Sequence, residues 1–338
     1  LPRIDFCNAD MTSYCSSPLR SYRMALWPVS SKAICLVTTG GALFLQVKKQ
    51  SSAAFKAFRK SPPEPPAITG ITSSSKVKGC PLSCVWCHNP ESQSGGKHIF
   101  HYAEKCISCA ACDAACPFGA ISKGNVDYAR CAFCGKCEIV CPVGALRVSG
   151  FELEEDEIVK IVIKDKPFYD QSGGGVTFSG GESMLCPDDV ASLARRCGEN
   201  SVHVAVDTAG NVPWKCFETV MPYVDLFLYD IKTLDNEKHR RYTGASNERI
   251  LDNLKRLLSS GKAVIVRIPV IPSINATAED MRKIRDFLDE NGGAPVELLP
   301  YHRLGENKYR ALGMLPKKFD VPTDETMREL KKIFIGLV

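Results

Sequence analysis

The sequence lacks any apolar run long enough to span a bilayer. Its only long apolar run near the N-terminus covers residues 33–47, about 15 residues, and two threonines and two glycines interrupt it. A membrane-spanning helix needs about 20 consecutive apolar residues. We therefore expect no transmembrane helix and no membrane partner.

The main part of the chain also lacks an excess of positive charge. The 338 residues hold 43 Lys and Arg against 38 Asp and Glu, which gives a net charge of +5. Residues 1–76 contain ten of the basic residues and three of the acidic ones, which leaves 33 basic and 35 acidic residues in the rest. A nucleic-acid surface needs basic side chains gathered on the folded part. This balance argues against a nucleic-acid partner.

Cysteine, by contrast, is abundant. The chain has 17 cysteines, and eleven of them fall into tight runs with gaps of two or three residues. Such runs are too crowded for the disulfide framework of a secreted protein and are typical of metal sites. Because thiolate ligands must stay reduced, we expect a cytoplasmic protein. The other six cysteines have no partner at ligand spacing and are predicted to be structural thiols: Cys7, Cys15, Cys35, Cys186, Cys197 and Cys216.

Residues 1–68 differ in composition from the rest of the chain. They show no sustained periodicity, are rich in Ser, Lys and Arg, and end in a proline-rich linker at residues 61–66. We expect a disordered N-terminal extension appended to the folded part. A transit peptide and a misread upstream segment are both open explanations for it.

Short apolar runs alternate with helical patterns through most of the remaining sequence. The runs that predict strands cover residues 72–78, 176–179, 202–207, 224–229, 263–268 and 296–299. The patterns that predict helices cover residues 188–197, 213–221, 248–259 and 278–291. Repeated strand-then-helix units favour a parallel sheet, so we predict an α/β fold with a partial (β/α)6 barrel from residues 69–96 and 151–338. Residues 97–150 hold eight cysteines and are predicted to be a small inserted α+β domain.

Cys80, Cys84 and Cys87 follow the first predicted strand, where a barrel places its catalytic loop. Three thiolates with gaps of three and two residues can hold three corners of a 4Fe-4S cube and leave the fourth iron without a protein ligand. A substrate-binding cluster needs such an open iron, as a catalytic metal needs one free position. The alternative is a structural zinc site completed by His88, and Trp86 would pack over either site.

The predicted insert contains one cysteine pattern twice. Each run has the spacing Cys-x2-Cys-x2-Cys-x3-Cys-Pro, which is typical of bacterial ferredoxins with two 4Fe-4S clusters. In that arrangement the fourth cysteine of each run crosses to the other cluster. One cluster would take Cys106, Cys109, Cys112 and Cys141, and the other would take Cys131, Cys134, Cys137 and Cys116. Both would be fully ligated and could only carry electrons; two zinc sites are the alternative, although zinc does not require two matching runs.

Taken in order, these motifs resemble the glycyl-radical enzyme activating enzymes, a family of radical S-adenosylmethionine (SAM) enzymes. The resemblance rests on the 80–87 loop, the two-cluster insert and the sequence Ser-Gly-Gly-Gly-Val-Thr-Phe-Ser-Gly-Gly-Glu at 172–182. Further motifs extend it over about residues 70–315: Asp-Ile-Lys at 230–232, Arg-Ile-Pro-Val-Ile-Pro at 267–272 and Leu-Leu-Pro-Tyr-His-Arg-Leu-Gly at 298–305. The similarity is to the branch with two auxiliary clusters in a ferredoxin-like insert, not to the short pyruvate formate-lyase activase.

The resemblance implies a set of site residues. Cys80, Cys84 and Cys87 would hold the cluster that binds SAM, and Lys232 joins them as a catalytic candidate. The residues expected to contact SAM are Trp86, His88, Asn89, Gly180, Gly181, Glu182, Asp207, Asp230, Lys232 and His302. As in relatives, Asp207 and Asp230 are also candidates for holding a monovalent cation. Four histidines match no motif and are predicted to be turn or surface residues: His98, His101, His203 and His239.

The resemblance also implies the chemistry. A reduced cluster would donate one electron to SAM, and cleavage would give methionine and a 5′-deoxyadenosyl radical. That radical would remove a hydrogen atom from a backbone glycine in the C-terminal loop of a partner glycyl-radical enzyme. Flavodoxin or ferredoxin would supply electrons through the insert, so the chain would need three 4Fe-4S clusters, SAM and anaerobic conditions.

Two other interpretations stay open. A peptide-modifying radical SAM enzyme would keep the chemistry and change the target, although such enzymes usually carry extra cysteines after the barrel and none lies beyond Cys216. An electron-transfer protein or inactive relative would use only the insert.

The chain departs from the family pattern ahead of the cluster loop. Relatives carry Asp-Gly-Pro-Gly-Ile-Arg-Thr there, whereas residues 66–79 of this chain share only Gly70, Ile71, Lys78 and Gly79 with them. The missing acidic and Arg residues leave open whether the first strand forms and how the partner's glycine loop enters. Ser183 also stands where many relatives have Pro, and we expect that change to be mild.

Overall fold

The computed structural model describes residues 73–149 and 153–336, with side chains from residue 78 onward. Ahead of them it describes only the backbone of four short strands: β1 (Ala33–Cys35), β2 (Thr38–Thr39), β3 (Ala42–Leu43) and β4 (Gln46–Lys48). β1 pairs with β4 and β2 with β3, both antiparallel. The predicted disorder of residues 1–68 otherwise falls outside the described residues. Within the described part, no helix is both long and apolar enough to cross a membrane.

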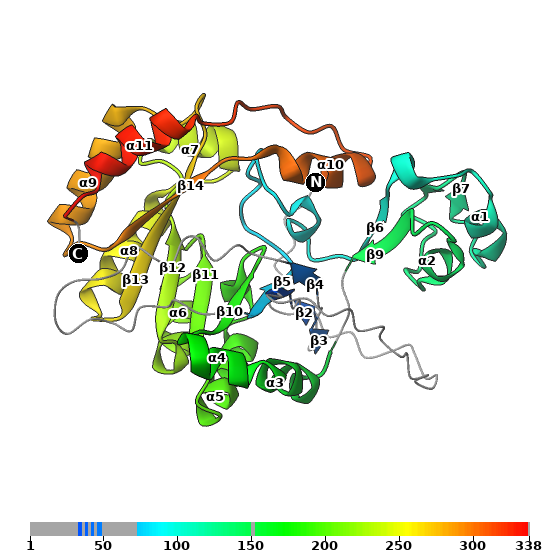
Figure 1. Cartoon of the computed structure of the whole chain (residues 1–338), viewed down its shortest axis with the longest axis horizontal. Helices are drawn as coiled ribbons and strands as arrows, with labels where there is room; N and C mark the ends of the chain where they lie inside the picture. Colours follow the sequence, from blue (N-terminus) through cyan, green and yellow to red (C-terminus); the bar gives the residue numbers. More distant parts are fainter. Residues whose placement is uncertain are drawn as a thin grey trace. The chain divides into compact units, whose positions relative to one another are not determined.

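Six parallel strands form the central sheet (Figure 1). They are β5 (Ser73–Val77), β10 (Gly175–Gly180), β11 (His203–Thr208), β12 (Leu226–Asp230), β13 (Ala263–Val270) and β14 (Val296–Pro300). Their spatial order follows the sequence, so each crossover returns beside the previous strand. Because β5 and β14 are the two ends of this order, the sheet is an open, partial barrel, and the predicted fold is confirmed.

The first strand forms despite its departure from the family pattern. β5 pairs in parallel with β10, in a register that places Ser73 beside Val176 and Val77 beside Gly180. Parallel pairing uses backbone N–H and C=O groups, which every residue except proline supplies in full. A serine-rich segment can therefore serve as the edge strand beside the buried strand β10.

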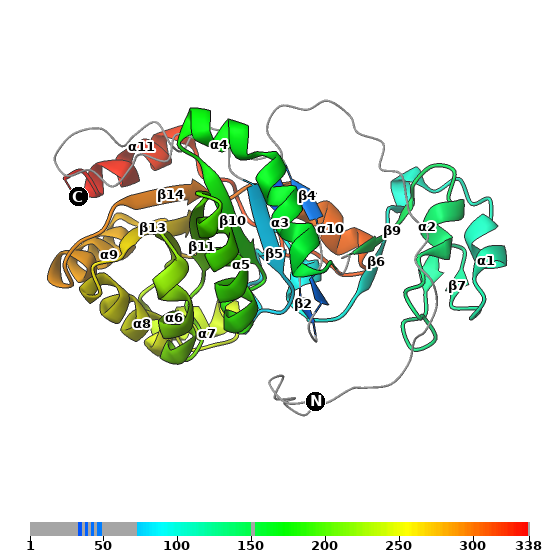
Figure 2. The ribbon, with the colours of Figure 1, turned by 90° about the horizontal axis from the view of Figure 1, so that it is seen from below.

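Helices connect the strands and complete the fold. They are α3 (Glu155–Lys164), α4 (Lys166–Ser172), α5 (Pro187–Glu199), α6 (Trp214–Val220), α7 (Asn236–Thr243), α8 (Glu248–Ser259), α9 (Ala278–Glu290), α10 (Glu306–Ala311) and α11 (Asp324–Ile333). The four predicted helices are confirmed as α5, α6, α8 and α9, which Figure 2 shows along the sheet.

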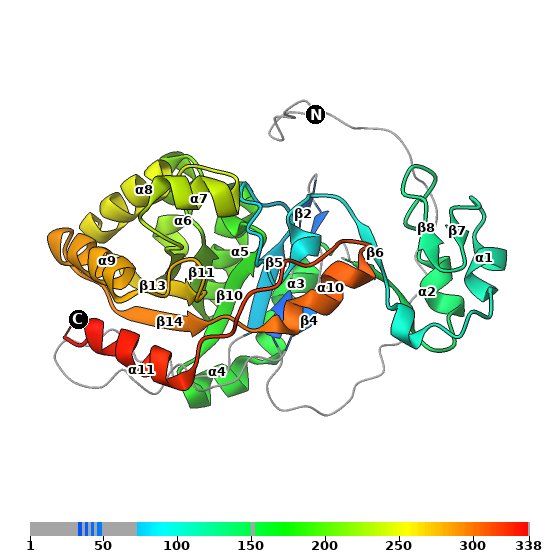
Figure 3. The same ribbon diagram turned by 90° about the horizontal axis from the view of Figure 1, so that it is seen from above.

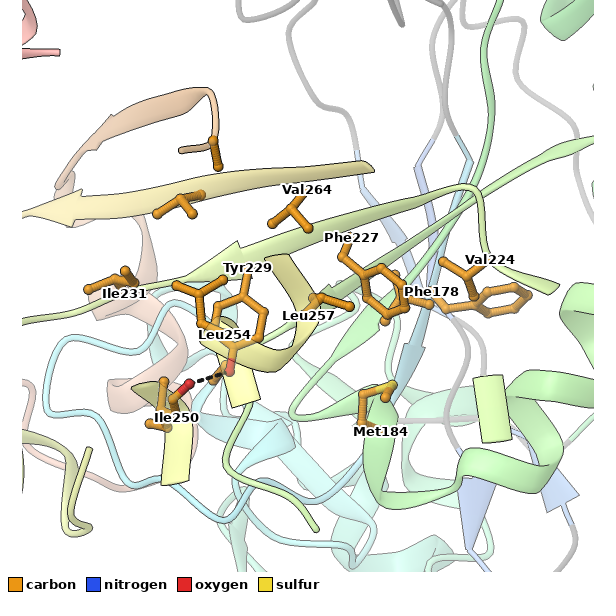
Figure 4. Packing of buried hydrophobic residues seen from close by; sticks show 14 of the residues in the cluster. Phe178, Met184, Val224, Phe227, Tyr229, Ile231, Ile250, Leu254, Leu257 and Val264 are labelled. Carbon is orange, nitrogen blue, oxygen red and sulfur yellow. Dashed lines mark hydrogen bonds between the residues drawn. The ribbon is translucent and has the colours of Figure 1, made fainter. Parts of the chain in front are cut away.

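The packing of α8 on the sheet shows how helix and strands share one core. Ile250, Leu254 and Leu257 recur at intervals of four and three residues and are buried, which gives α8 one apolar face. Tyr229 of β12 reaches this face, and its hydroxyl donates to the carbonyl oxygen of Ile250 at 2.7 Å (Figure 4). Phe227 on the same strand is fully buried beside them. This core fixes the positions of the strand ends.

The insert has a small core of its own. Its elements are β6 (His98–His101), η3 (Ala103–Lys105), α1 (Ala111–Ala115), β7 (Ile121–Ser122), β8 (Asn125–Val126), α2 (Lys136–Val140) and β9 (Leu146–Ser149). β6 pairs antiparallel with β9 and also contacts α10 (Figure 3). The buried residues of this core are Ile99, Ile121, Cys137, Leu146 and Val148. The domain limits at residues 69–96, 97–150 and 151–338 remain predictions.

Candidate functional site

The cluster loop, residues 79–93, folds back on itself directly after β5. The backbone N–H of Gly79 donates to the carbonyl of Ser92 at 2.9 Å, and that of Cys80 donates to the carbonyl of Gln93 at 3.2 Å. Gly79 has a φ of +95°, which glycine adopts without the strain that other residues would have. The first cysteine therefore begins a closed loop.

The C-terminal end of α7 holds the middle of the cluster loop. The N–H of Ser83 donates to the carbonyl of Thr243 at 2.7 Å, and that of Val85 donates to Tyr242 at 3.0 Å. Gly244 ends the helix with a φ of +81°, and a Cβ atom there would lie 2.5 Å from the hydroxyl oxygen of Ser83. A helix that the sequence did not predict thus positions the backbone between the first and third cysteines.

The three thiols of the loop fit an iron-sulfur cluster. Burial raises the pKa of Cys80, Cys84 and Cys87, that of Cys84 to about 12, and Lys232 opposes the shift at Cys84. Buried thiols bind as thiolates only beside a strong positive centre, which the irons of a cluster supply. The backbone N–H of Asn89 lies 3.4 Å from the sulfur of Cys87 and donates to it.

The turn at residues 180–182 packs directly on the start of the cluster loop. The N–H of Glu182 donates to the carbonyl of Gly79 at 2.8 Å. A Cβ atom at Gly181 would lie 2.1 Å from that carbonyl oxygen and 2.4 Å from the carbonyl oxygen of Ser92. Only glycine fits at this contact, and Gly180 beside it has a φ of +143°. The two predicted glycines are therefore required where turn and loop meet.

The carboxylate of Glu182 is engaged inside the protein. It accepts hydrogen bonds from the hydroxyl of Thr208 at 2.7 Å and from the N–H groups of Met184 at 3.1 Å and Ala209 at 2.8 Å. Burial raises the pKa of Glu182 to about 7, although these bonds favour its ionised form. Glu182 thus ties the end of β10 to the end of β11.

Four charged side chains form a network near the carboxyl ends of β11, β12 and β13. Arg267 pairs with Asp207 and, at 3.0 Å, with one oxygen of Asp230. Lys232 lies 3.3 Å from the other oxygen of Asp230. Burial alone would raise the pKa of Asp230, but Arg267 and Lys232 hold it below its ordinary value. The structure therefore brings three predicted site residues together around Arg267.

Lys232 connects this network with the cluster loop. Its side chain is mostly buried, and burial alone would lower its pKa. Asp230 and the thiolates of Cys84 and Cys80 raise the pKa of Lys232 instead, so the side chain stays an ammonium group. A positive charge is thus held beside the thiols.

Arg267 is a site residue that the sequence analysis did not single out, although it lies in a quoted motif. β13 alternates between buried and partly exposed positions, and Arg267 occupies one of the partly exposed positions. The sequence did contain a signal for this residue, because Arg267 is the single charged residue in an otherwise apolar strand. Its two aspartate partners come from other strands, so the pairing required the fold.

His88 and His302 lie together beside the third cysteine. Their rings stack with centroids 4.0 Å apart, and Nε2 of His88 lies 2.9 Å from the carbonyl oxygen of His302. A Cβ atom at Gly305 would lie 3.0 Å from Cα of His88. The segment that begins α10 therefore packs tightly on the cluster loop.

Trp86 precedes Cys87 in the chain, and Asn89 follows it by two residues. Trp86 is buried, with its ring centroid 6.3 Å from that of Tyr242 and 6.4 Å from that of Phe319. The side-chain oxygen of Asn89 accepts a hydrogen bond from Lys308 of α10 at 2.9 Å. Both residues are therefore fixed by packing from later parts of the chain.

The prediction that four unmatched histidines lie in turns or on the surface is wrong. His98 and His101 lie in β6, His203 lies in β11, and all three are half-buried. His239 lies in α7 and is only 1% exposed. A single histidine carries no periodic signal, so the sequence could not show that each belongs to a regular element.

The two cysteine runs of the insert fold alike. A residue with positive φ precedes α1 and α2, and each helix ends at the fourth cysteine of its run. The sulfur of Cys116 accepts the N–H of Ala120 at 3.3 Å, and that of Cys141 accepts the N–H of Ala145 at 3.2 Å. The sequence repeat is therefore also a structural repeat.

Four thiols line one cavity in the insert. They are Cys116, Cys131, Cys134 and Cys137, the set that the crossed pattern assigns to one cluster. Its apolar lining includes Ile99, Phe118 and Ile121. Of the other set, Cys109 is exposed and three are half-buried: Cys106, Cys112 and Cys141. Across the described residues, no three His, Cys, Asp or Glu side chains converge as a single metal ion would require.

Comparison with known proteins gives matches over both parts of the chain. The family model described as the radical SAM superfamily matches residues 111–288, and the one described as a 4Fe-4S binding domain matches residues 99–122. The chain is 42% identical over 277 residues to the trans-4-hydroxy-L-proline dehydratase activating enzyme of Clostridioides difficile, covering 78% of this chain and 91% of that protein. It is 40% identical over 257 residues to the (2S)-3-sulfopropanediol dehydratase activating enzyme of Klebsiella oxytoca, covering 72% and 81%.

A solved structure of a domain of pyruvate-formate lyase-activating enzyme from Bacteroides vulgatus is also similar. It is 31% identical, with a TM-score of 0.43, and covers 49% of this chain and 96% of that chain.

Proposed function

This chain belongs to the glycyl-radical enzyme activating enzymes of the radical SAM superfamily, and we propose how its residues perform that activity. It is an iron-sulfur enzyme that cleaves SAM reductively and activates a glycyl-radical enzyme. This conclusion rests on the match to the trans-4-hydroxy-L-proline dehydratase activating enzyme. The match covers 91% of that protein and includes both the barrel and the insert of this chain. The similarity supports this activity and not the alternative in which only the insert works.

We assign Cys80, Cys84 and Cys87 as ligands of the 4Fe-4S cluster that binds SAM. When bound, this cluster supplies the single electron that splits SAM into methionine and a 5′-deoxyadenosyl radical, which takes a hydrogen atom from the partner's glycine. The chain's own residues bury the three thiols, hold the loop through α7 and the 180–182 turn, and place a positive charge beside it.

The ends of the strands would bind SAM. Because three donors already hold the carboxylate of Glu182, we assign it to fixing the turn, and the backbone of Gly180 and Gly181 to meeting the amino group of SAM. Lys232 would face the carboxylate end of SAM, since its ammonium group lies toward the thiols. The remaining contacts that we propose are Trp86, His88, Asn89, Asp207, Asp230 and His302.

We do not include a monovalent cation in the proposed site. Asp207 and Asp230 carry two negative charges, and Arg267 and Lys232 carry two positive ones within ion-pair distance. Three of the four carboxylate oxygens are thus paired with protein groups: one of Asp207 with Arg267, and the two of Asp230 with Arg267 and Lys232. Charge balance at these strand ends requires no further ion.

The insert would hold two further 4Fe-4S clusters with crossed ligands, for three clusters in all. The cavity lined by Cys116, Cys131, Cys134 and Cys137 supports one of the two ligand sets. With four cysteines each, these clusters would have no open iron and would carry electrons to the barrel. Flavodoxin or ferredoxin in a reducing cytoplasm would be the donor.

The test is an anaerobic iron and sulfide analysis combined with electron paramagnetic resonance of the reduced protein, with and without SAM. We expect about twelve irons per chain, as three four-iron cubes require, and one signal that changes on adding SAM. The same protein should form 5′-deoxyadenosine from SAM and dithionite. The Cys84→Ala variant should lose both the SAM-sensitive signal and this product while keeping about eight irons. Absence of 5′-deoxyadenosine from a protein with all twelve irons would disprove the proposed function.

A further inference from the structure

The hydroxyl of Tyr309 in α10 is buried and has no hydrogen-bond partner among the residues that the structure describes. The whole residue is 8% exposed. A buried hydroxyl left unpaired loses its hydrogen bonds to water without replacement, so folded proteins almost always give such a group a partner. The missing acceptor is therefore expected to be something that the polypeptide alone does not provide.

The packing of α10 places Tyr309 against the cluster loop. A Cβ atom at Gly305 would lie 3.0 Å from Cα of His88 and 3.5 Å from the carbonyl oxygen of Cys87. Tyr309 follows Gly305 by four residues, so it lies one turn further along the same face of the helix. Lys308 fixes this arrangement from the neighbouring position, because its ammonium group donates to Asn89 at 2.9 Å.

A buried ion pair holds the helix and the loop together at this contact. Lys308 pairs with Glu91, which lies in η2 (Pro90–Ser92), four residues after the last cysteine of the loop, and is 2% exposed. The side chain of Lys308 is itself mostly buried. Helix α10 therefore cannot move away from the loop without separating two buried charges, which is costly.

Two thiols of the cluster loop are among the groups that shift the pKa of Tyr309. Burial raises the pKa of Tyr309, and the next largest contributions come from the thiolates of Cys87 and Cys84. Tyr301 and then Glu91 contribute less. The hydroxyl thus lies within electrostatic reach of two of the three cysteines assigned to the SAM-binding cluster.

We propose that the hydroxyl of Tyr309 donates a hydrogen bond to a sulfur atom of the cluster held by Cys80, Cys84 and Cys87, and so raises its reduction potential. A donor beside a cluster sulfur stabilises the reduced form, which carries one more negative charge. Tyr309 therefore helps the cluster to accept the electron that it later gives to SAM. This inference rests on the proposed function of the same loop.

The test compares Tyr309→Phe with Tyr301→Phe in the full-length protein carrying all its clusters. Tyr301 is a matched control, because it is also buried and its ring lies 5.7 Å from that of His88, on the same loop. The charged groups around the hydroxyl of Tyr301 are Glu306 and Arg303 rather than the thiols. Redox titrations followed by electron paramagnetic resonance would measure each cluster, with the SAM-sensitive signal identifying the cluster of the barrel.

We expect Tyr309→Phe to shift the SAM-sensitive cluster to a more negative potential, seen as a several-fold lower ratio of reduced to oxidised cluster at a fixed applied potential. The other two clusters serve as an internal reference and should keep their potentials, as should all three in Tyr301→Phe. Replacing Tyr309 by 3-fluorotyrosine, a more acidic donor of similar size, should shift the potential the other way. A packing defect would not shift the potential in opposite directions in these two proteins.

Three results would overturn the inference. The first is an unchanged potential in Tyr309→Phe at full iron content, and the second is an equal shift in both phenylalanine variants. The third is a change confined to SAM affinity, with the SAM-free potential unaltered, which would mean that the hydroxyl faces SAM instead. Failure of the proposed function is a separate outcome, because then no SAM-sensitive cluster would be present in the unmodified protein.

Discussion

At the scale of single residues, Arg267 lies between two carboxylates that would otherwise repel each other. Asp207 and Asp230 both pair with its guanidinium group. Arg267→Met would leave Asp207 without its cationic partner and Asp230 with Lys232 alone in a mostly buried site, and breaking a buried pair costs about 3 kcal/mol at the low end of its range. We expect a melting temperature several degrees lower in anaerobic thermal unfolding.

A second substitution separates lost charge balance from lost packing. Adding Asp207→Asn to Arg267→Met removes the carboxylate that has lost its partner, while Asp230 keeps Lys232, so it should restore part of the melting temperature. If the double variant melts no higher than the single one, the guanidinium group stabilises the fold through its packing alone.

His239 should make stability depend on pH. Its Nδ1 lies 2.6 Å from the carbonyl oxygen of Ala245, and within the described part of the chain its Nε2 is buried without a partner. Burial lowers the pKa of His239, and the charge of Lys232 lowers it further. The unfolded chain therefore takes up a proton near pH 6.5 while the folded chain does not, so stability should fall as the pH drops below about 6.5.

The check is the melting temperature of the wild type and of His239→Asn at pH 7.5 and pH 5.5. Asparagine can still donate to Ala245 but does not titrate, so the variant should lose less stability on acidification. Acid damage to the clusters affects both proteins alike, which makes the difference between them the readout. Equal losses would show that His239 is not the group responsible.

At the scale of elements, the contact between the 180–182 turn and the cluster loop leaves no room for a side chain. Gly181→Ala would drive a Cβ atom into the carbonyl oxygens of Gly79 and Ser92. We expect the variant to lose about four of about twelve irons and its SAM-sensitive signal while the insert keeps its clusters. Iron analysis and electron paramagnetic resonance measure both effects.

The matched control is Gly198→Ala. Gly198 lies in α5, and a Cβ atom there would meet nothing within 4 Å. Alanine favours a helix over glycine by roughly 0.5–1 kcal/mol, so this variant should keep all its irons and melt slightly higher. Full iron content in both variants would mean that the turn can move away from the loop.

The sequence predicted an element well where the spacing of its apolar residues matched a helix or a strand, and poorly where other features define the element. The interval of buried side chains located α8 at Glu248–Ser259, with the same limits as in the structure. α7 was missed because it is mostly charged and is stabilised by its cap, in which Asp235 accepts the N–H of Lys238 at 2.9 Å. The sequence left open whether β5 forms, because its pairing with β10 uses backbone groups that almost every residue type carries.

The residues of the candidate site also differ in how well the sequence predicted them. Cysteine spacing indicated the ligands directly, since metal coordination restricts which residues can serve and how far apart they lie. The partners of Arg267 and the buried hydroxyl of Tyr309 depend on which strands and helices become neighbours. Those contacts join residues far apart in the sequence, so they could be found only once the fold was known.

At the scale of the whole molecule, the crossed ligand pattern makes the two cysteine runs dependent on each other. Cys116 of the first run and Cys131 of the second line the same cavity, so they should serve one cluster. The double variant Cys116→Ala/Cys131→Ala should then lose about four irons, no more than either single variant.

The decisive comparison pairs Cys116 with a cysteine of its own run. Under crossed ligation Cys106 belongs to the other cluster, so Cys116→Ala/Cys106→Ala should lose about eight irons and keep only the SAM-sensitive cluster. Uncrossed ligation predicts the reverse, with about eight irons lost from the Cys116/Cys131 pair and about four from the Cys116/Cys106 pair. Iron analysis of the two double variants side by side distinguishes these patterns. The SAM-sensitive signal, retained in both, would show that the barrel folds and binds its cluster when the insert is damaged.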